Sequence, residues 1–438
     1  MSFERGDPGR GPQAGRAVGR AWFRVGAFGA VVALLSALCL FYTGRFHHFA
    51  TVNDLWFGSD IWRHVAWAND PSEAGRWQLH PGSFLLFDGY GRLLRALGLE
   101  PSPDELLGFA MPVIALVALG LVAAAERLAR HGTGGRASPW AVAAVLAAVG
   151  PVVAFGPMPE SHILGGTALL LQAVWVLSVL RDEAAGASGP QVRSRTAGAI
   201  ALGAVAASFT VTNLLPATIL LWALRRLRRP LVRAALVGAL AGAALLAVHK
   251  LVAPLPLVWP LVRTVRYEMS LLTPPHALQI GWSFQHLVLF QFGMPRTELI
   301  TWTHPADGAV VTSIHSASAT PLQWAAFALW LAAVGLWVRR GRAGEPAERR
   351  FGAYCAAALL ALLAFHVPFS AWEAYIFSPH AWPYVVVPGV LAWRWGMQAR
   401  NRAVILCVAA AVALSLLQTA YGLWWLEHLP GDTGSRPG

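Results

Sequence analysis

Residues 22–43 read WFRVGAFGAVVALLSALCLFYT, an almost unbroken apolar run. About 20 apolar residues are what a helix needs to cross the hydrocarbon core of a bilayer. A cleaved signal peptide carries a small-x-small cleavage site, and this run has none. The stretch therefore predicts a first membrane span that stays in the mature protein, preceded by a Gly-, Arg- and Pro-rich cytoplasmic tail.

The composition of the whole chain agrees with this prediction. Of 438 residues, 56% are hydrophobic and only 13% are charged, whereas soluble domains carry roughly 25% charged residues. So little charge excludes a soluble enzyme and a nucleic-acid-binding protein. The net charge of +12 is then typical of arginine-rich cytoplasmic loops. The three cysteines all lie in apolar runs without a CxxC pair, which argues against a disulfide framework or a zinc knuckle.

Further apolar runs of span length follow along the chain. They lie at about 104–126, 138–156, 161–180, 234–253, 320–338, 351–369, 381–397 and 403–425. The longer run at 196–223 is interrupted near Thr212-Asn213 and predicts either one tilted span or two short helices joined at TVTN.

Residues 82–98, GSFLLFDGYGRLLRALG, are apolar but contain three charged side chains. A charge in the middle of a bilayer costs about 2.5–3.5 kcal/mol or more. We therefore expect an amphipathic helix that lies in the membrane interface rather than crossing it.

The arginine distribution orients the chain, because cytoplasmic loops collect basic residues. If 82–98 does not cross and 196–223 forms a pair, the predicted cytoplasmic segments hold most of the 34 Lys and Arg residues. The prediction is an all-α, polytopic membrane protein with about 11 spans and a cytoplasmic N-terminus. Its segments are a tail at 1–20, a transmembrane module at 21–253 with an extracytoplasmic loop at 44–103, a second extracytoplasmic loop at 254–318, transmembrane helices at 319–426 and a short tail at 427–438.

Residues 53–70, NDLWFGSDIWRHVAWAND, combine acids with tryptophans directly after the first span. On a helix Asp60 and His64 share one face because they are four residues apart, and Arg63 is adjacent. One interpretation is a solvated helix whose tryptophans anchor it at headgroup depth. The other is a carboxylate beside a membrane-facing cleft, where Asp60 acts as a general base and Asp54 lies nearby.

Glu160 lies in GPMPESH at 156–162, between two apolar runs. An ionisable residue so close to hydrocarbon is a functional candidate. The structural alternative is a helix N-terminus, where Glu is favourable. On the predicted topology Glu160 and Asp60 face the same extracytoplasmic side, and two acids from separate loops at one surface favour a shared site.

Other candidates are less specific. His80-Pro81 opens the amphipathic segment, and helix initiation by proline explains the pair without a function. Thr212-Asn213 needs hydrogen-bond partners, for which structural capping is the favoured interpretation. Arg263 and Arg266 have the i,i+3 spacing to clamp a phosphate, although ordinary loop charge explains them slightly better.

The stretch FSAWEAYIFSPHAWPY at 369–384 is rich in aromatic residues. An aromatic belt at the membrane interface accounts for much of it. Glu373 and His380 do not belong to such a belt, so they and Tyr375 are candidates for substrate contacts. The chain has no GxxxxGK[ST], HExxH, GxSxG or strand-associated GxGxxG motif, which leaves no sign of a nucleotide site or of those hydrolases.

The order of these features resembles the GT-C glycosyltransferases, a group that includes the protein O-mannosyltransferases and the bacterial aminoarabinose transferases of lipid A. They share one N-terminal span, then a long outside loop with an acid, here Asp60 in FGSDIWRH. An interfacial helix follows that starts at a basic-Pro pair, here His80-Pro81. After two spans comes an acid in a short outside loop, here Glu160 in MPESH.

This resemblance covers the architecture of roughly residues 20–250 and only short motifs beyond. The pair at 212–213 and YIFSPH at 375–380 also resemble a group of bacterial membrane proteins related to these enzymes. The first loop departs from the O-mannosyltransferases because it lacks an adjacent Asp-Asp or Asp-Glu pair.

The resemblance implies an inverting transferase in the plasma membrane of a bacterium. It would move a sugar from a polyprenyl phosphate or pyrophosphate to an extracytoplasmic glycan, lipid or protein. Asp60 would be the base, and Glu160 a second acid that shapes the site directly or through a divalent metal ion. His80 stands where related enzymes often carry a phosphate-binding Lys; a neutral His binds phosphate less well, and Arg263 or Arg266 would supply the charge. The candidate substrate-binding residues are Asp54, Arg63, His64, His80, His162, Asn213, Arg263, Arg266, Glu373, Tyr375 and His380, and no metal ligand is assigned.

Two other functions remain open on the sequence alone. A transporter or lipid flippase tends to show repeated halves and charges at mid-membrane depth, and neither is evident here. A non-catalytic assembly partner is the third hypothesis, and it would tolerate the loss of both acids.

Overall fold

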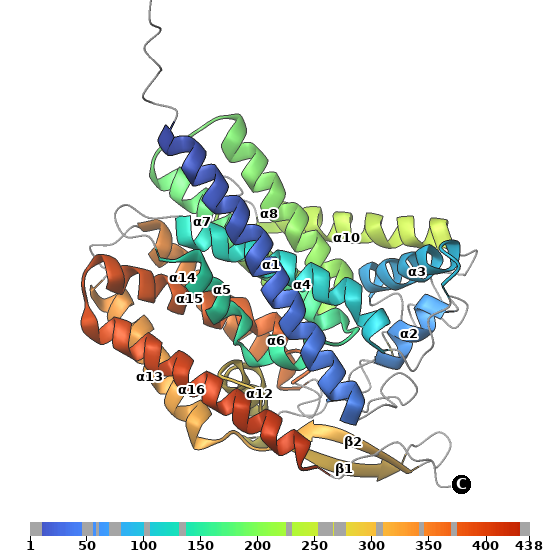
Figure 1. Cartoon of the computed structure of the whole chain (residues 1–438). Helices are drawn as coiled ribbons and strands as arrows, with labels where there is room; N and C mark the ends of the chain where they lie inside the picture. The colour runs from blue at the N-terminus through green and yellow to red at the C-terminus, as the bar shows by residue number, and fades with distance from the viewer. Residues whose placement is uncertain are drawn as a thin grey trace, which may run out of the picture.

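The computed structural model describes residues 11–45, 56–57, 61–69, 80–99, 106–130, 137–224, 230–252, 266, 277–303, 310–340, 346–368 and 375–429. Within these ranges the chain is mostly helical (Figure 1). The N-terminal helices are α1 (Gly11–Arg45), α2 (Ile61–Asn69), α3 (Pro81–Ala96), α4 (Leu106–Arg130), α5 (Pro139–Ala147), α6 (Gly150–Phe155), α7 (Ser161–Ala184), α8 (Pro190–Phe209), η2 (Val211–Asn213), α9 (Leu214–Leu221) and α10 (Pro230–Val252). After them come α12 (Ala277–Leu287), η3 (Leu289–Gln291), strands β1 (Thr297–Thr303) and β2 (Val310–Ser316), and helices α13 (Pro321–Arg340), α14 (Pro346–His366), α15 (Ser378–Gln398) and α16 (Arg402–Glu427).

Salt bridges join several helix termini at one end of the bundle, which we call the arginine end. Arg24 in the N-terminal half of α1 bonds Glu126 near the end of α4 at 2.9 Å. Arg195 near the start of α8 bonds Asp182 near the end of α7 at 2.6 Å, and Arg181 of α7 pairs with Glu348 in the first turn of α14. The opposite termini of these helices therefore lie at the other end.

That other end, which we call the histidine end, buries His80, His162 and His380. Here Arg45, the last residue of α1, donates to the carbonyl of Leu429 at 2.7 Å, just beyond the end of α16. The Tyr42 hydroxyl donates to the Val153 carbonyl of α6 at 3.0 Å. Figure 1 shows α1 running diagonally in front of the bundle, with α13 and α16 side by side at its edge.

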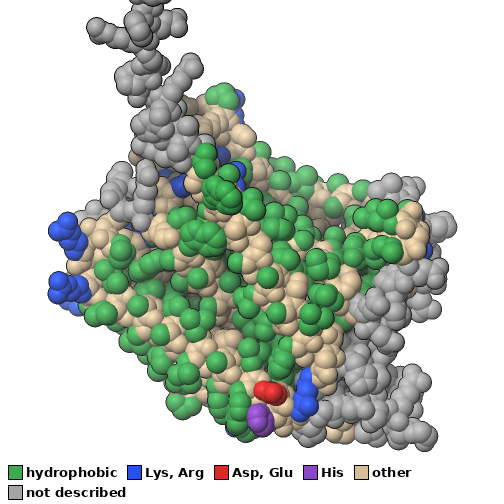
Figure 2. Space-filling view, in the orientation of Figure 1, with side chains coloured by type: hydrophobic (Ala, Val, Ile, Leu, Met, Phe, Trp, Pro, Cys, Tyr) green, Lys and Arg blue, Asp and Glu red, His purple; other side chains and the backbone are tan. Residues whose placement is uncertain are grey.

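Among the described residues, five helices are long and apolar enough to cross a membrane: Val18–Arg45 of α1, α4, α7, Pro321–Arg339 of α13, and α16. They coincide with the spans predicted at 22–43, 104–126, 161–180, 320–338 and 403–425. α7 is the most enclosed of them, whereas α1, α13 and α16 expose one apolar side. The face in Figure 2 is accordingly covered mainly by hydrophobic side chains, with most basic ones at its upper and left margins.

The break predicted within 196–223 is present. α8 ends at Phe209, η2 turns the chain, and α9 runs back beside α8 and α7. The return reaches the arginine end, where Arg233 of α10 donates to the Leu224 carbonyl at 3.0 Å. Of the two interpretations, the pair of short helices is therefore the observed one.

The single helix predicted at 138–156 is wrong, because the chain divides there into α5 and α6. Pro151 stands in the first turn of α6, where its missing N–H removes the hydrogen bond that would continue α5. Gly150 lies against η3 so closely that a Cβ would be 2.9 Å from the Gly293 carbonyl carbon. The bend therefore serves close packing of α6 on the segment that follows α12.

Residues 254–318, predicted as a loop, contain regular structure that was not predicted. β1 pairs antiparallel with β2, with Thr297 opposite Ser316. The chain after the first span joins this hairpin, because Trp56 bridges Ile314 and the Phe57 N–H donates to the Ile314 carbonyl at 2.7 Å.

The predicted helix at 82–98 is confirmed as α3 and starts at Pro81.

Candidate functional site

Glu160 is fully buried at the turn between α6 and α7. Its backbone is extended, and its Oε1 atom accepts hydrogen bonds from the His162 backbone N–H at 3.1 Å and the Ser161 hydroxyl at 3.1 Å. The His162 Nδ1 atom lies 2.7 Å from the same oxygen. The N-cap interpretation is thus confirmed, since the carboxylate accepts a hydrogen bond from the His162 N–H in the first turn of α7.

Capping occupies only one of the two carboxylate oxygens. Oε2 is buried and has no hydrogen-bond partner among the residues that the structure describes. Burial raises the pKa of Glu160, but the charge and hydrogen bonds of His162 and the charge of His64 lower it more. The net pKa lies well below the usual range of a glutamate, so the carboxylate is ionised at neutral pH.

Histidines from several helices surround this carboxylate. The His162 ring centroid lies 5.3 Å from that of His380 on α15 and 5.5 Å from that of His80 at the start of α3. His366, the last residue of α14, stacks on Phe377 at 4.4 Å. All four histidines are buried, so polar groups from α3, α7, α14 and α15 meet at one place.

A glycine explains how α15 comes so close to α7. A Cβ at Gly166 would lie 2.7 Å from the carbonyl carbon of Pro379, so any side chain there would force the helices apart. His162 lies one turn before Gly166, and His380 follows Pro379. The close approach therefore sets the two imidazoles side by side.

His80 is the N-cap residue of α3, with Pro81 at the first helical position. Its Nδ1 atom lies 2.9 Å from the Phe209 carbonyl at the end of α8 and 3.3 Å from the Ser161 hydroxyl. Because a carbonyl only accepts, the Nδ1–H donates to it. Helix initiation by Pro81 is confirmed. The His80 hydrogen bond connects the start of α3 to the end of α8 beside the site.

Asn213 also has a structural role, as the favoured interpretation predicted. Its side-chain amide donates to the Ala206 carbonyl in the last turn of α8 at 3.0 Å. The amide packs against Gly165 of α7, where no Cβ would fit. Asn213 therefore holds the bend between α8 and α9 against the first turns of α7.

Helix α2 brings two more predicted residues to this end. His64 is buried, packs its ring 4.9 Å from Phe87 of α3, and acts electrostatically on Glu160. The Arg63 guanidinium lies over the Trp62 ring at 5.1 Å. Asp60 directly precedes Ile61, the first residue of α2.

Several predicted residues lie outside the described ranges: Asp54, Asp60, Arg263 and Glu373. Arg266 is described and exposed, and nothing in the described contacts brings it to the site. Tyr375 is buried among aromatic rings, 4.9 Å from Phe57 and 5.1 Å from Phe155. Its hydroxyl has no hydrogen-bond partner within the described segments.

Two buried residues of this region were not predicted from the sequence. His366 ends an apolar helix, and a single ionisable residue at such a place was a usable signal. Gln291 of η3 donates from Nε2 to the Ser378 carbonyl at 2.8 Å and to the Leu287 carbonyl at 3.0 Å. It connects η3 to the start of α15, a contact that no local pattern indicates.

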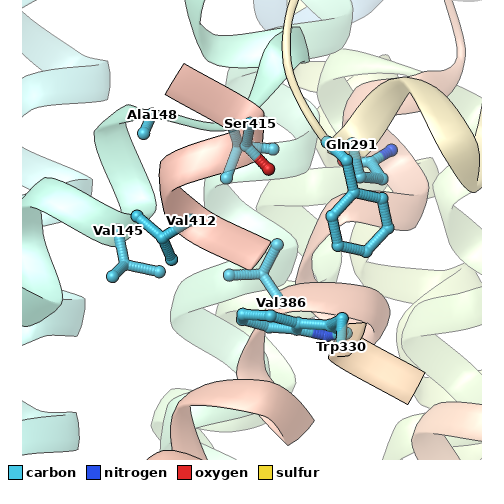
Figure 3. A pocket seen from close by; sticks show the side chains of 9 residues that line it. Val145, Ala148, Gln291, Trp330, Val386, Val412 and Ser415 are labelled. Atoms are coloured by element: carbon cyan, nitrogen blue, oxygen red, sulfur yellow. The ribbon is translucent and has the colours of Figure 1, made fainter. Parts of the chain in front are cut away.

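A small apolar cavity lies beyond Gln291, between α5, α13, α15 and α16 (Figure 3). Its volume is about 20 Å³, room for about one water molecule. Its lining consists of Val145, Ala148, Val149, Gln291, Phe292, Trp330, Val386, Val412 and Ser415. Without a charged group, this cavity offers packing space rather than chemistry.

The cluster around Glu160 can instead bind polar groups and hold protons. In the described segments no three His, Cys, Asp or Glu side chains are arranged to hold a metal ion. The sequence matches no protein-family model and no curated protein.

Proposed function

We propose that the protein is a membrane glycosyltransferase that takes a sugar from a polyprenyl-phosphate-linked donor and passes it to an acceptor outside the cytoplasm. One observation carries the proposal: Glu160 is a buried, ionised carboxylate, set among histidines where several helices end, and one of its oxygens has no hydrogen-bond partner among the described residues. A carboxylate that only capped α7 would not need His64 and His162 around it. An ionised acid kept in such a place is typical of a functional site.

Asp60 is the proposed base, and its place in the chain supports that role. It stands immediately before α2, whose His64 is near enough to lower the pKa of Glu160. Three residues before Asp60, Phe57 packs on Phe155 and Tyr375. The described residues on either side of Asp60 in the sequence, Phe57 and His64, therefore both lie at the histidine end.

The proposed reaction is a single displacement. Asp60 takes the proton of the acceptor hydroxyl, the hydroxyl oxygen bonds to the anomeric carbon, and the bond from that carbon to the phosphate oxygen breaks. The electron pair leaves with the lipid phosphate, and the anomeric configuration inverts. A phosphate is a good leaving group, so one base suffices, whereas glycosidases use a carboxylate pair.

The charge distribution supports an extracytoplasmic site. The arginine end carries Arg24, Arg130, Arg181, Arg195, Arg233 and Arg350. Under the positive-inside rule this end faces the cytoplasm, which puts Glu160 on the opposite side. About 11 spans, with α3 in the membrane interface, complete the proposed topology in a bacterial plasma membrane.

The donor phosphate needs positive charge, and His80 is poorly suited to supply it. Its Nδ1–H is committed to the Phe209 carbonyl. Arg63, next to His64 on α2, is a buried guanidinium at this end and a better candidate, as are Arg263 and Arg266 from the sequence. A guanidinium binds phosphate through two parallel hydrogen bonds.

Sugar transfer to membrane acceptors, measured with a labelled polyprenyl-phosphate donor in vesicles, tests the proposal. Asp60→Asn and Glu160→Gln should each abolish transfer. Glu126→Gln is the matched control, because Glu126 is also buried but lies at the arginine end. Full transfer by Asp60→Asn would refute the base role. Substrate counterflow in proteoliposomes without a covalent product would instead indicate that the protein is a transporter.

A further inference from the structure

Buried polar atoms without described hydrogen-bond partners lie on both sides of His162, in Glu160 and in His380. Both ring nitrogens of His380 and the Oε2 atom of Glu160 are buried and lack hydrogen-bond partners in the part of the chain that the structure describes. The His162 ring connects them, since it bonds Glu160 on one side and stacks on His380 on the other. Buried polar atoms nearly always have hydrogen-bond partners in native proteins. The unpartnered atoms of Glu160 and His380 therefore indicate that a ligand supplies these partners.

The chemistry of these atoms selects the ligand. An ionised carboxylate only accepts hydrogen bonds, and a neutral imidazole offers one acceptor and one donor. The charge of Glu160 repels a phosphate, whereas hydroxyl groups can donate to Oε2 and both donate to and accept from His380. The ring of Phe377, 5.8 Å from that of His380, adds an apolar surface beside them.

We propose that Glu160 and His380 form a binding site for a neutral polyhydroxylated ring, which is the glycosyl group of the donor, and that the phosphate binds elsewhere. The identity of the ligand as the donor sugar rests on the proposed function. The site itself rests on the unpartnered atoms and their arrangement. It predicts that sugar and lipid phosphate are recognised by separable residues.

The decisive variant is His380→Phe, which keeps a ring of similar size and removes both nitrogens. Tyr384→Phe is its matched control, because it also removes a buried polar atom without a described partner, from the same helix α15 beside Cys355. Glu160→Gln tests the carboxylate with a second, independent change. Because no described group bonds either nitrogen in the free protein, His380→Phe should leave it at least as stable as the wild type.

Thermal unfolding of the purified chain in a sugar-free detergent provides the measurement. The probes are a panel of free hexoses and pentoses, inorganic phosphate, and a polyprenyl phosphate without sugar. We expect at least one monosaccharide to raise the unfolding temperature of the wild type and of Tyr384→Phe. His380→Phe and Glu160→Gln should lose that shift while keeping the shift caused by polyprenyl phosphate.

The proposal is overturned if no monosaccharide stabilises the wild type, or if the sugar shift survives in His380→Phe. It is equally overturned if inorganic phosphate gives the shift that His380→Phe loses, since the site would then bind an anion. Its failure is distinct from that of the enzyme hypothesis. Sugar binding without any transfer would refute the glycosyltransferase function but support the sugar site. Normal transfer by His380→Phe would refute the sugar site but support the glycosyltransferase function.

Discussion

Replacing Gly166 with alanine tests the contact between α7 and α15 that sets His162 beside His380. The new Cβ would lie 2.7 Å from the Pro379 carbonyl carbon, whereas ordinary contact begins at 3.4 Å. The two helices must therefore separate by about 0.7 Å or more, since backbone atoms cannot rotate away as a side chain does. Forcing extra atoms into a packed core costs about 1–3 kcal/mol.

Gly335→Ala supplies the matched control. Gly335 is also inside a helix, α13, but a Cβ there meets nothing within 4 Å. Both substitutions gain about 1 kcal/mol of helix propensity, so the difference between them isolates the cost of the close contact. Denaturant unfolding in one detergent should place Gly166→Ala about 1–3 kcal/mol below Gly335→Ala.

The same pair should separate in function. Moving α15 away from α7 displaces His380 from His162, so sugar transfer should fall in Gly166→Ala and remain normal in Gly335→Ala. Equal stability of the two variants would show that the helices are not in contact at Gly166. Reduced stability with unchanged transfer would instead show that the close approach of α7 and α15 is not needed for the activity of the proposed site.

Three further outcomes follow from single side chains. Asn213→Ala should lower the unfolding free energy by about 1 kcal/mol because one buried hydrogen bond is lost, and an unchanged denaturant midpoint would contradict this. Glu126→Gln should cost no more than about 1 kcal/mol, since its partners Arg24 and Arg130 are 58% and 44% exposed and solvent screens their charges; a cost that persists in high salt would argue against this screening. Burial lowers the pKa of His315 in β2, so its contribution to hairpin stability is present above about pH 6.5 and lost as the pH falls below that. Amide exchange of β1 and β2 should accelerate there, and His315→Gln should remove the pH dependence.

Local signals in the sequence were sufficient where one residue determines the local backbone. Pro81 starts α3, and the polar pair at 212–213 marks the bend between α8 and α9. Glu160 acts as a helix N-cap, which its position after Pro159 and before a long apolar run indicated. Each of these outcomes depends on neighbours within a few residues, so the sequence alone can predict it.

The hairpin lies within 254–318, which was predicted to be a loop. Residues 297–303, TELITWT, are rich in β-branched and aromatic residues, which favour strands. The split between α5 and α6 was also missed, although Gly150-Pro151 is a local break signal. In both places the average hydrophobicity of a long stretch of sequence hid a short local signal, either a strand-favouring run or a Gly-Pro break.

The site itself depends on contacts between residues far apart in the chain. Glu160 and His380 were named as candidates separately, but no pattern shows that His162 stands between them. His366 belongs to the same cluster only because α14 and α15 pack against α7. Such a meeting is a property of the tertiary packing, and it becomes visible only once the helices are placed.

The two outermost helices carry a consequence for membrane topology. Arg24 places the start of α1 at the arginine end, while Arg45 and Leu429 place the end of α1 and the end of α16 together at the other. If the proposed membrane lies between these two ends, the chain from α1 to α16 crosses it an odd number of times, whatever each intermediate segment does. Reporter domains placed before α1 and after α16 should therefore give opposite signals, and this parity can be read without resolving a single loop.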